Sequence, residues 1–420
     1  MLITGCSDPG SGKSASQSSW PDQKASLKGT TLTIWGASGL NTELGEPVKA
    51  FEKATGADIT LVPFSGIYEN GVQTKVATGD KPDLALWQPT QSQLTALNAK
   101  QNLLPIDNAP WLSKVKSQVR DVAGFLGKTR YAEVFSEPAV DGVYYNKKVF
   151  ADAGISSPPK GWSEMVADAK LIKAKGIDPV FDIGGDQWGT QYIVQAQLAE
   201  AAKGGLWDRV NANKEKFTDP TIKGAIQNYK DLIDAGLLNS NLSTATFDQQ
   251  VSAILGGTAG MTFMVNGFYQ SMLQKAGAAK LDSTVGFFPL SAKGNIATYL
   301  PDESNGLVAF NTGNAKKEKA AKQFMEFLMG DGYAGFIKDN KTVSILNGVP
   351  SPDGVPAIAT KVSDSFANSV GGMQALAVAN PDLYLYLANM DAGSTTVDGV
   401  AQSTQTQFAQ LAKASGIKGF

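Results

Sequence analysis

Flat aromatic side chains stand beside amides and carboxylates at several points of the sequence. Trp87 is followed by Gln88, and Trp188 and Tyr192 are four residues apart in a glycine-containing segment. Aromatic rings can stack on the apolar C–H faces of a pyranose, while amides and carboxylates bond its hydroxyls. Each buried hydroxyl needs such a partner, because an unsatisfied polar group costs about 1–3 kcal/mol. These residue types therefore favour a site for a neutral ligand rich in hydroxyls.

The residue types that are scarce narrow the chemistry further. The chain has no histidine and one cysteine, which excludes Ser-His-Asp and Cys-His catalysis, an internal disulfide and a thiolate zinc site. Only three of its 37 basic residues are arginines, so bidentate recognition of an anionic ligand is disfavoured. A net charge of −2 provides no basic field for nucleic acid. We expect no metal, no cofactor and no catalytic residue.

Further candidate binding residues occupy predicted turns and strand ends. Trp87 ends a predicted strand, where an aromatic suits a cleft, although burial in the core is the common alternative. Tyr192 is equally compatible with packing, and the acidic turn near residue 302 is equally compatible with a solvent-exposed loop. Tyr384 and Tyr386 alternate as in a strand. The candidate ligand-binding residues are Ser38, Asn41, Trp87, Gln88, Glu137, Trp188, Tyr192, Phe268, Tyr269, Asp302, Glu303 and Asn305.

The elements that must position these residues alternate in type. Short apolar runs predict strands, and the stretches between them have helical periodicity, with glycines where helices should end. Such alternation predicts an α/β fold with a mainly parallel first sheet. The predicted strands are 31–35, 59–64, 84–87, 142–145, 180–183 and 307–310, and the predicted helices are 46–55, 68–78, 164–175, the helix opened by Asp219-Pro220, and 315–329.

The first residues form a separate segment. Ile3-Thr4-Gly5-Cys6 resembles a bacterial lipobox, in which the cysteine is lipidated, and a stretch rich in Ser, Gly, Lys and Gln follows it. The alternative is a tail with one accidental cysteine. We expect Cys6 to carry a lipid and the following residues to act as a flexible tether.

Longer stretches carry a family resemblance. The run from Asp141 to Phe150, continued by Ala153-Gly154-Ile155 and Trp162-Ser163-Glu164, resembles a signature of oligosaccharide-type extracellular solute-binding proteins, the relatives of maltose-binding protein. The segments 255–269, 315–329 and 396–412 resemble later parts of the same family, in the expected order. In that family a stacking aromatic, often a tryptophan, usually lies at the end of the segment 255–269, where this chain has Phe268 and Tyr269. We expect Tyr269 to be the stacking platform and Phe268 to pack inward.

The resemblance implies two α/β lobes of the periplasmic-binding, or Venus-flytrap, type, joined by several crossovers. It divides the chain into a tether of residues 1–29, one lobe of 30–140 plus 300–341, and another of 141–299 plus 342–420. It also implies a monomeric receptor that closes on a neutral oligosaccharide and delivers it to the permease subunits of an ABC importer. The lipobox adds the expectation that Cys6 anchors this receptor at the outer face of the cytoplasmic membrane.

Two other functions fit parts of this pattern. A receptor of the same fold could bind a polyamine or a peptide, because aromatic and acidic residues also hold cations. A glycoside hydrolase needs only two carboxylates, but no motif here places such a pair across one sugar. We therefore expect a binding protein and not an enzyme.

Overall fold

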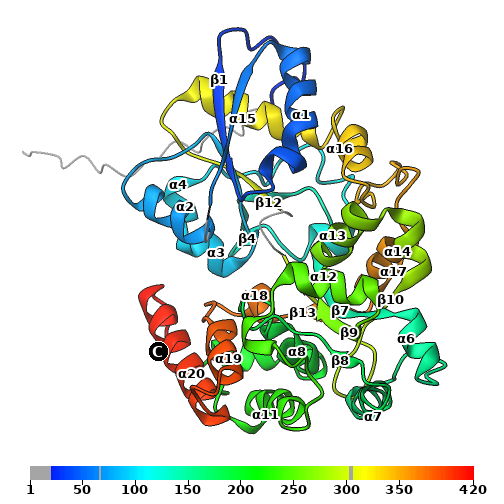
Figure 1. Cartoon of the computed structure of the whole chain (residues 1–420). Helices are drawn as coiled ribbons and strands as arrows, with labels where there is room; N and C mark the ends of the chain where they lie inside the picture. The colour runs from blue at the N-terminus through cyan, green and yellow to red at the C-terminus, as the bar shows by residue number, and fades with distance from the viewer. Residues whose placement is uncertain (1–19, 66–67, 302–305) are drawn as a thin grey trace, which may run out of the picture.

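The chain folds into two lobes, each built on its own β-sheet, as the computed structural model shows (Figure 1). The structure describes residues 20–65, 68–301 and 306–420. Lobe 1 is built on a five-stranded sheet with the order β2-β1-β3-β12-β6, and lobe 2 on a six-stranded sheet in which β7 is central. The α/β class and the two-lobed architecture agree with the prediction.

The sheet of lobe 1 is parallel on one side and antiparallel on the other. Its first three strands pair in parallel, as the alternation of the sequence predicts, whereas β12 runs antiparallel to β3 and β6. The strands are β1 (Thr31–Gly36), β2 (Asp58–Pro63), β3 (Leu84–Leu86), β6 (Ala132–Val134) and β12 (Gly306–Ala309), with a small hairpin of β4 (Phe125–Leu126) and β5 (Thr129–Arg130).

Helices cover both faces of this sheet. The long helix α1 buries Leu44, Val48 and Phe51 at helical spacing against one face, together with α15. Helices α2 and α3 pack against the other face. The helices of lobe 1 are α1 (Leu40–Thr55), α2 (Tyr68–Ala77), α3 (Gln91–Ala96), α4 (Ala99–Asn102), α5 (Ser117–Arg120), α15 (Ala315–Leu328) and α16 (Tyr333–Asp339).

The sheet of lobe 2 is mostly antiparallel. Strand β7 pairs antiparallel with β9, β10 and β11, while β8 and β13 add parallel pairs at the edges. Its strands are β7 (Ala139–Asn146), β8 (Asp178–Val180), β9 (Ala259–Met264), β10 (Val285–Phe288), β11 (Ala297–Leu300) and β13 (Ser369–Gly371).

Most of the helices belong to lobe 2. The predicted helix after Asp219-Pro220 is present, with Pro220 in its first turn. Tyr384 and Tyr386 lie on helix α19, so the prediction of a strand there is wrong. The helices are α6 (Lys147–Asp152), α7 (Trp162–Lys173), α8 (Gln191–Gln197), α9 (Ala199–Lys203), α10 (Leu206–Asn211), α11 (Pro220–Asp234), the 3₁₀ turn η1 (Leu242–Thr244), α12 (Phe247–Gly256), α13 (Gly267–Ala276), α14 (Ala278–Thr284), α17 (Ala357–Phe366), α18 (Met373–Leu376), α19 (Leu383–Asp391) and α20 (Val397–Ala414).

The chain passes between the lobes more than once. It leaves lobe 1 between β6 and β7, returns between β11 and β12, and crosses again between α16 and α17. Close to the last passage, Leu346 forms a bridge with Val115, and the backbone N–H of Lys116 donates to the carbonyl of Ile345. The lobes are therefore linked at one side by several crossover segments.

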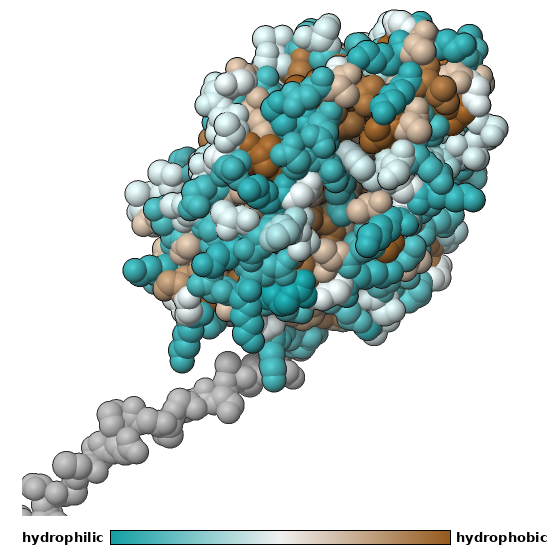
Figure 2. All heavy atoms as spheres, turned by 90° about the horizontal axis from the view of Figure 1, so that it is seen from below, coloured by the Kyte–Doolittle hydropathy of each residue, from teal (hydrophilic) through white to brown (hydrophobic). Residues whose placement is uncertain are grey.

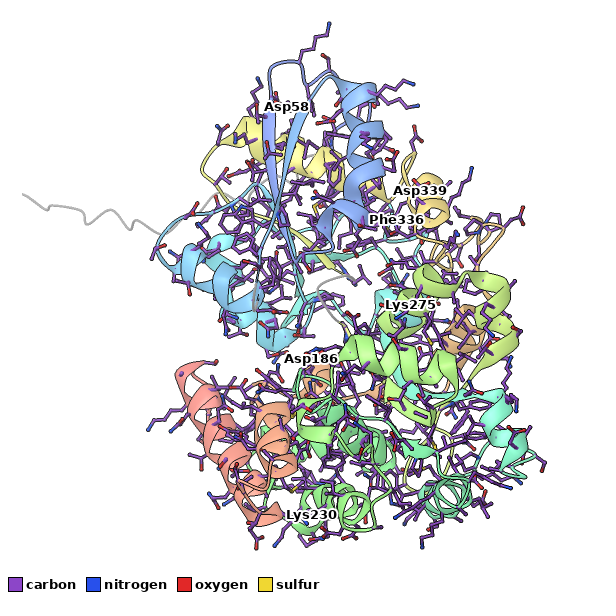
Figure 3. All side chains as sticks on the ribbon, in the orientation of Figure 1. Asp58, Asp186, Lys230, Lys275, Phe336 and Asp339 are labelled. Atoms are coloured by element: carbon purple, nitrogen blue, oxygen red, sulfur yellow. The ribbon has the colours of Figure 1, made fainter. Side chains whose placement is uncertain are left out.

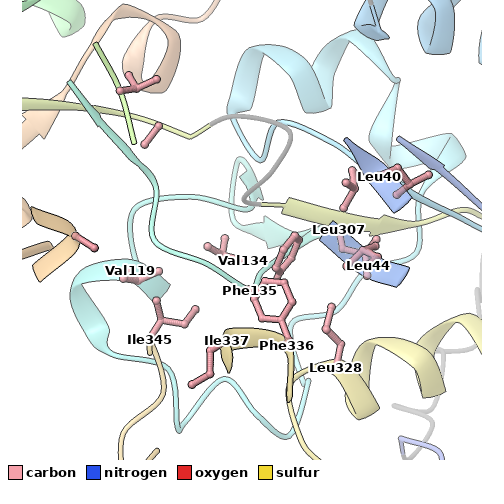
Figure 4. Packing of buried hydrophobic residues seen from close by; sticks show 14 of the residues in the cluster. Leu40, Leu44, Val119, Val134, Phe135, Leu307, Leu328, Phe336, Ile337 and Ile345 are labelled. Carbon is pink, nitrogen blue, oxygen red and sulfur yellow. The ribbon is translucent and has the colours of Figure 1, made fainter. Parts of the chain in front are cut away.

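An apolar cluster continues through these crossovers. Phe135, which lies between the two sheets, packs edge-on against Phe336 with their ring centroids 5.3 Å apart. Leu307 and Ile345 lie in the same cluster (Figure 4). The cluster extends from helix α1 to helices α13 and α17, so that it joins the lobes on the crossover side.

Candidate functional site

Lobe 2 presents a half-exposed aromatic group at the end of strand β8. Residues 184–190 form a turn-rich loop between β8 and α8. Trp188 on this loop is 37% exposed, and its ring centroid lies 6.1 Å from that of Tyr192 and 5.4 Å from that of Phe247. An exposed indole flanked by two further rings forms a platform of the kind that stacks on apolar ligand faces.

The backbone of this loop lies too close to its neighbours for side chains at two positions. A Cβ atom added to Gly185 would lie 2.6 Å from the carbonyl carbon of Thr244, and one added to Gly184 would lie 2.7 Å from the carbonyl oxygen of Leu242. The Gly185 N–H donates to the carbonyl of Ala245. The two glycines therefore allow the loop to pack against residues 242–245, which lead into α12.

Helix α12 supports the loop from the other side. Thr246 and Gln249 form a capping box at its start, which fixes where the helix begins and places Phe247 in the first turn. The carboxylate of Asp186 accepts a hydrogen bond of 2.6 Å from the Phe247 N–H. In Figure 3, Asp186 lies at the side of lobe 2 that faces lobe 1, whereas Asp58 and Lys230 lie at opposite ends of the molecule.

Lobe 1 contributes a polar pair at the end of its own strands. The Gln88 amide donates to the carboxylate of Glu69 across 2.7 Å, and both side chains belong to segments near the end of β3 or the start of α2. Burial raises the pKa of Tyr384 on lobe 2, and the carboxylates of Asp382 and, from lobe 1, Glu69 raise it further. The negative charge of Glu69 on lobe 1 therefore acts on the Tyr384 hydroxyl of lobe 2.

A cavity of about 130 Å³ lies between the lobes. Pro89, Gln91 and Phe125 of lobe 1 line it together with Ala375 of helix α18 in lobe 2. Figure 1 likewise places α3 directly opposite α18. This volume is smaller than the cavities of 300–1,000 Å³ that usually hold small molecules, so a longer ligand must also use the open surfaces beside it.

A larger cavity of about 380 Å³ lies between α7 and α11, on the outer side of lobe 2. Trp162, Val166 and Leu232 line it. Ligands of α/β proteins usually bind at the carboxyl ends of strands and between domains, so the smaller interlobe cavity is the better candidate despite its volume. The face of the molecule seen in Figure 2 is largely hydrophilic, with its apolar residues interrupted by polar ones.

Several predicted binding residues are buried in the cores instead. Trp87 has no exposed surface, and its indole N–H donates to the carbonyl of Gln93 across 3.1 Å. The prediction that Trp87 offers its ring to a ligand is therefore wrong for this structure, because α3 folds back over the ring. Phe268 is also fully buried, between Tyr144 and Phe247.

The other buried candidates lie near the crossovers. Tyr269 is 3% exposed, which contradicts its prediction as a stacking platform, and burial raises its pKa to about 12. Glu137 is 5% exposed, and its carboxylate accepts a hydrogen bond of 2.6 Å from the Ser363 hydroxyl. Burial raises the pKa of Glu137. These side chains connect segments of the two lobes and present little surface to a ligand.

The remaining candidates have different placements. Ser38 and Asn41 are exposed at the turn into α1 and its first turn. Cys6, Asp302, Glu303 and Asn305 lie outside the residues that the structure describes. The structure thus brings Trp188 and Tyr192 together, with Gln88 on the opposing lobe. Sequence reasoning missed Phe247, Glu69 and Asp186, although the capping box at Thr246 could have placed Phe247 beside a loop.

Elements for other chemistry are not evident in the described parts of the chain. No group of three or more acidic, cysteine or histidine side chains among the described residues could hold a metal ion. The described helices include none that is long and apolar enough to cross a membrane.

Comparison with known proteins agrees with the two-lobed fold. Residues 38–335 match the sequence profile of the family described as bacterial extracellular solute-binding protein. The diacetylchitobiose binding protein DasA of Streptomyces coelicolor is 26% identical over 73% of this chain and 71% of its own length. The multiple sugar-binding protein of Streptococcus mutans is 24% identical over 69% of this chain and 68% of its own length.

Solved structures show the same fold. A chitin oligosaccharide binding protein superposes with a TM-score of 0.78 at 22% identity, covering 91% of this chain and 99% of the other. The binding protein RafE in complex with raffinose gives a TM-score of 0.76 at 19% identity, with coverage of 91% and 99%. Proteins of this family bind solutes and are not enzymes. The chain belongs to the bacterial extracellular solute-binding proteins.

Proposed function

We propose that this protein captures an oligosaccharide between its lobes and delivers it to the permease subunits of an ABC importer. The observation that carries the proposal is the partly exposed Trp188 ring, flanked by Tyr192 and Phe247, on the loop whose Asp186 lies at the side of lobe 2 that faces lobe 1. Gln88 and Glu69 supply hydrogen-bonding groups on lobe 1. A stacking ring on one lobe and hydrogen-bonding groups on the other match the two kinds of surface that a pyranose presents.

The positions of the arginines support a neutral ligand. Arg120 pairs with Asp121, and Arg209 pairs with Glu215. Arg130 is 3% exposed and donates to backbone carbonyls, among them that of Ala123. Since all three guanidinium groups are engaged away from the Trp188 platform, none offers a bidentate grip for a carboxylate or phosphate there.

The relatives point the same way. Two proteins whose names specify sugars, DasA and the multiple sugar-binding protein, match along about two thirds or more of this chain. From these relatives we infer only the class of ligand, an oligosaccharide. The sugar, its linkage and its length are left to experiment.

Cellular placement follows from the same proposal. We place the receptor on the outer face of the cytoplasmic membrane as a monomer, with a lipid on Cys6 as its anchor. We propose residues 30–140 plus 300–341 as lobe 1 and 141–299 plus 342–420 as lobe 2, although β7 begins at Ala139 and β11 ends at Leu300 within the sheet of lobe 2. Residues 345–346 contact lobe 1. Closure of the lobes around the sugar would exclude water and strengthen each polar contact.

A ligand screen tests the proposal. The purified protein is titrated with gluco-, galacto-, xylo- and fructo-oligosaccharides and chitin oligosaccharides, followed by calorimetry, with spermidine and short peptides in parallel. We expect a micromolar or tighter oligosaccharide and recovery of that sugar uncleaved. Tight binding of spermidine or a peptide, with no detectable binding of any sugar, would contradict the proposed function.

A further inference from the structure

Two carboxylates meet at one tyrosine hydroxyl behind the Trp188 loop. The Tyr229 hydroxyl of helix α11 lies 2.7 Å from Oδ2 of Asp182 and 3.0 Å from Oδ2 of Asp391. Asp182 is 2% exposed, and its other oxygen accepts the Ile183 N–H. The second oxygen of Asp391, Oδ1, is buried and has no hydrogen-bond partner.

This geometry requires a proton on one of the carboxyl groups. A tyrosine hydroxyl has one hydrogen, so it can donate to only one of the two carboxylates. If both carboxyl groups were ionised, the one that receives no hydrogen bond would lie at hydrogen-bond distance from the hydroxyl oxygen, with no hydrogen between the two oxygen atoms. A protonated Asp391 instead donates to the Tyr229 oxygen while Tyr229 donates to Asp182, which satisfies both contacts.

The three side chains hold the ends of the Trp188 loop. Asp182 lies at the start of the loop, and Oδ2 of Asp391 is 3.0 Å from where a Cβ of Gly184 would be. At the other end, the Thr190 hydroxyl donates to the carbonyl of Tyr384, one of the residues of α19 that precede Asp391. Helix α19 therefore contacts both ends of the segment that carries Trp188.

No opposite charge compensates the pair within the described structure. Helix α8 and the turn η1, which pack against α19, contain no charged residue. On α20, Asp398 pairs with Lys223 of α11, and Lys413 is exposed in the last turn of the helix. The other charged groups of α11 lie on its exposed side or pair there: Lys230, Asp231 and Asp234.

The titration behaviour agrees with the geometry. Burial, followed by the charge of Asp182, raises the pKa of Asp391 to about 8, although its bond with Tyr229 acts in the opposite direction. Burial also raises the pKa of Asp182. Because the folded state retains a proton that an unfolded aspartate loses near pH 4, stability declines as the pH rises from about 4 to 8 and is level above it.

We propose that Asp182 and Asp391 share one proton through the Tyr229 hydroxyl and that the three side chains act as positioning residues for the 184–190 loop, so that ligand affinity depends on that proton. The part of this inference that concerns ligand affinity rests on the proposed function. Loss of the proton leaves two adjacent carboxylates that repel one another beneath Gly184. The loop then moves away from α19, and Trp188 leaves its place beside Tyr192.

The test compares the wild-type protein with Asp391→Asn, whose amide donates to Tyr229 at every pH. Emission of Trp188, taken as the difference between each protein and its Trp188→Phe counterpart, is measured without ligand from pH 6 to 9.5. We expect a sigmoidal change with a midpoint near pH 8 in the wild-type protein and none in Asp391→Asn. Asp398→Asn, on the exposed turn of α20, is the matched control and should titrate like the wild-type protein.

Affinity for a sugar identified by the screen is then measured over the same range. We expect it to fall about tenfold between pH 7 and 9.5 in the wild-type protein and to stay level in Asp391→Asn. Tyr229→Phe removes the hydroxyl whose hydrogen bond lowers the pKa of Asp391, so we expect its emission change to occur at a higher pH than in the wild-type protein.

The outcomes separate this inference from the proposed function. A level emission profile in the wild-type protein, or an unchanged midpoint in Asp391→Asn, overturns the proton-sharing assignment. A pH-dependent emission that Asp391→Asn abolishes supports it even where no sugar in the panel binds, a result that counts against the proposed function alone.

Discussion

Trp87 and Trp188 occupy comparable places in the two lobes, and their surroundings make them opposite in character. Each follows the carboxyl end of a strand, β3 or β8. Trp87 is completely buried with its N–H bonded to Gln93, whereas Trp188 is 37% exposed beside two other rings. The segment after each strand decides the difference: a capped helix folds over Trp87, and a glycine loop held against residues 242–245 leaves Trp188 at the surface.

The largest expected effect is on the free energy of unfolding, when the buried ring of Trp87 is removed. Trp87→Ala should reduce the free energy of unfolding by about 3–5 kcal/mol, because it leaves a cavity in the core of lobe 1. Chemical denaturation followed by circular dichroism measures this loss. A change below about 1 kcal/mol would mean that Trp87 does not hold α2 and α3 against the sheet.

The exposed ring should affect affinity instead of stability. Trp188→Ala should weaken sugar binding by about 2 kcal/mol, roughly thirtyfold, through loss of stacking and apolar contact area. Its free energy of unfolding should change by less than about 1 kcal/mol, because the ring is partly solvated. Calorimetry and denaturation of the same preparation measure both quantities, and unchanged affinity would remove Trp188 from the site.

Substitution of a loop glycine should sharpen the comparison further. Gly185→Ala places a methyl group against the backbone of Thr244, and we expect about 1–3 kcal/mol of lost stability together with weaker sugar binding. Gly224→Ala on helix α11 is the matched control, since a Cβ there meets nothing within 4 Å. That control should be neutral or stabilising by about 0.5–1 kcal/mol. Equal effects of the two substitutions would contradict close packing of the loop.

The smallest effect is expected on lobe 1. Gln88→Ala removes one hydrogen-bonding group of lobe 1 and leaves Glu69 without its amide partner. We expect sugar affinity to fall by about 0.5–1.5 kcal/mol, a factor of roughly two to ten, with unfolding almost unchanged. The matched control is Gln227→Ala on the outer surface of α11. An effect larger than that of Trp188→Ala would reverse the roles assigned to the two lobes.

Local patterns predicted lobe 1 better than lobe 2. Strands β1, β2 and β3 alternate with helices along the chain, so their periodicity was enough to place them in one parallel sheet. The antiparallel partners of β7 are β9, β10 and β11, which follow more than 110 residues later. Pairing over that separation leaves no trace in a local pattern, and the order of the second sheet could not be predicted from it.

The candidate site was predicted in part for a similar reason. The glycine-containing loop with Trp188 and Tyr192 could be found from residue types alone. Exposure depends on what packs against a ring, so Trp87 and Tyr269 looked available although their rings are buried, whereas the inward packing expected for Phe268 agrees with its burial. The Tyr229 pair with Asp182 and Asp391 joins residues up to 209 positions apart, beyond the reach of spacing arguments.

The central claim is that Trp188, and not Trp87, contacts the ligand. Tryptophan emission during titration with the sugar tests it most directly, comparing the wild-type protein with Trp188→Phe and Trp87→Phe. The account predicts that the ligand-induced change disappears in Trp188→Phe and persists in Trp87→Phe. A change that persists in Trp188→Phe and is lost in Trp87→Phe would contradict it and place the ligand against lobe 1.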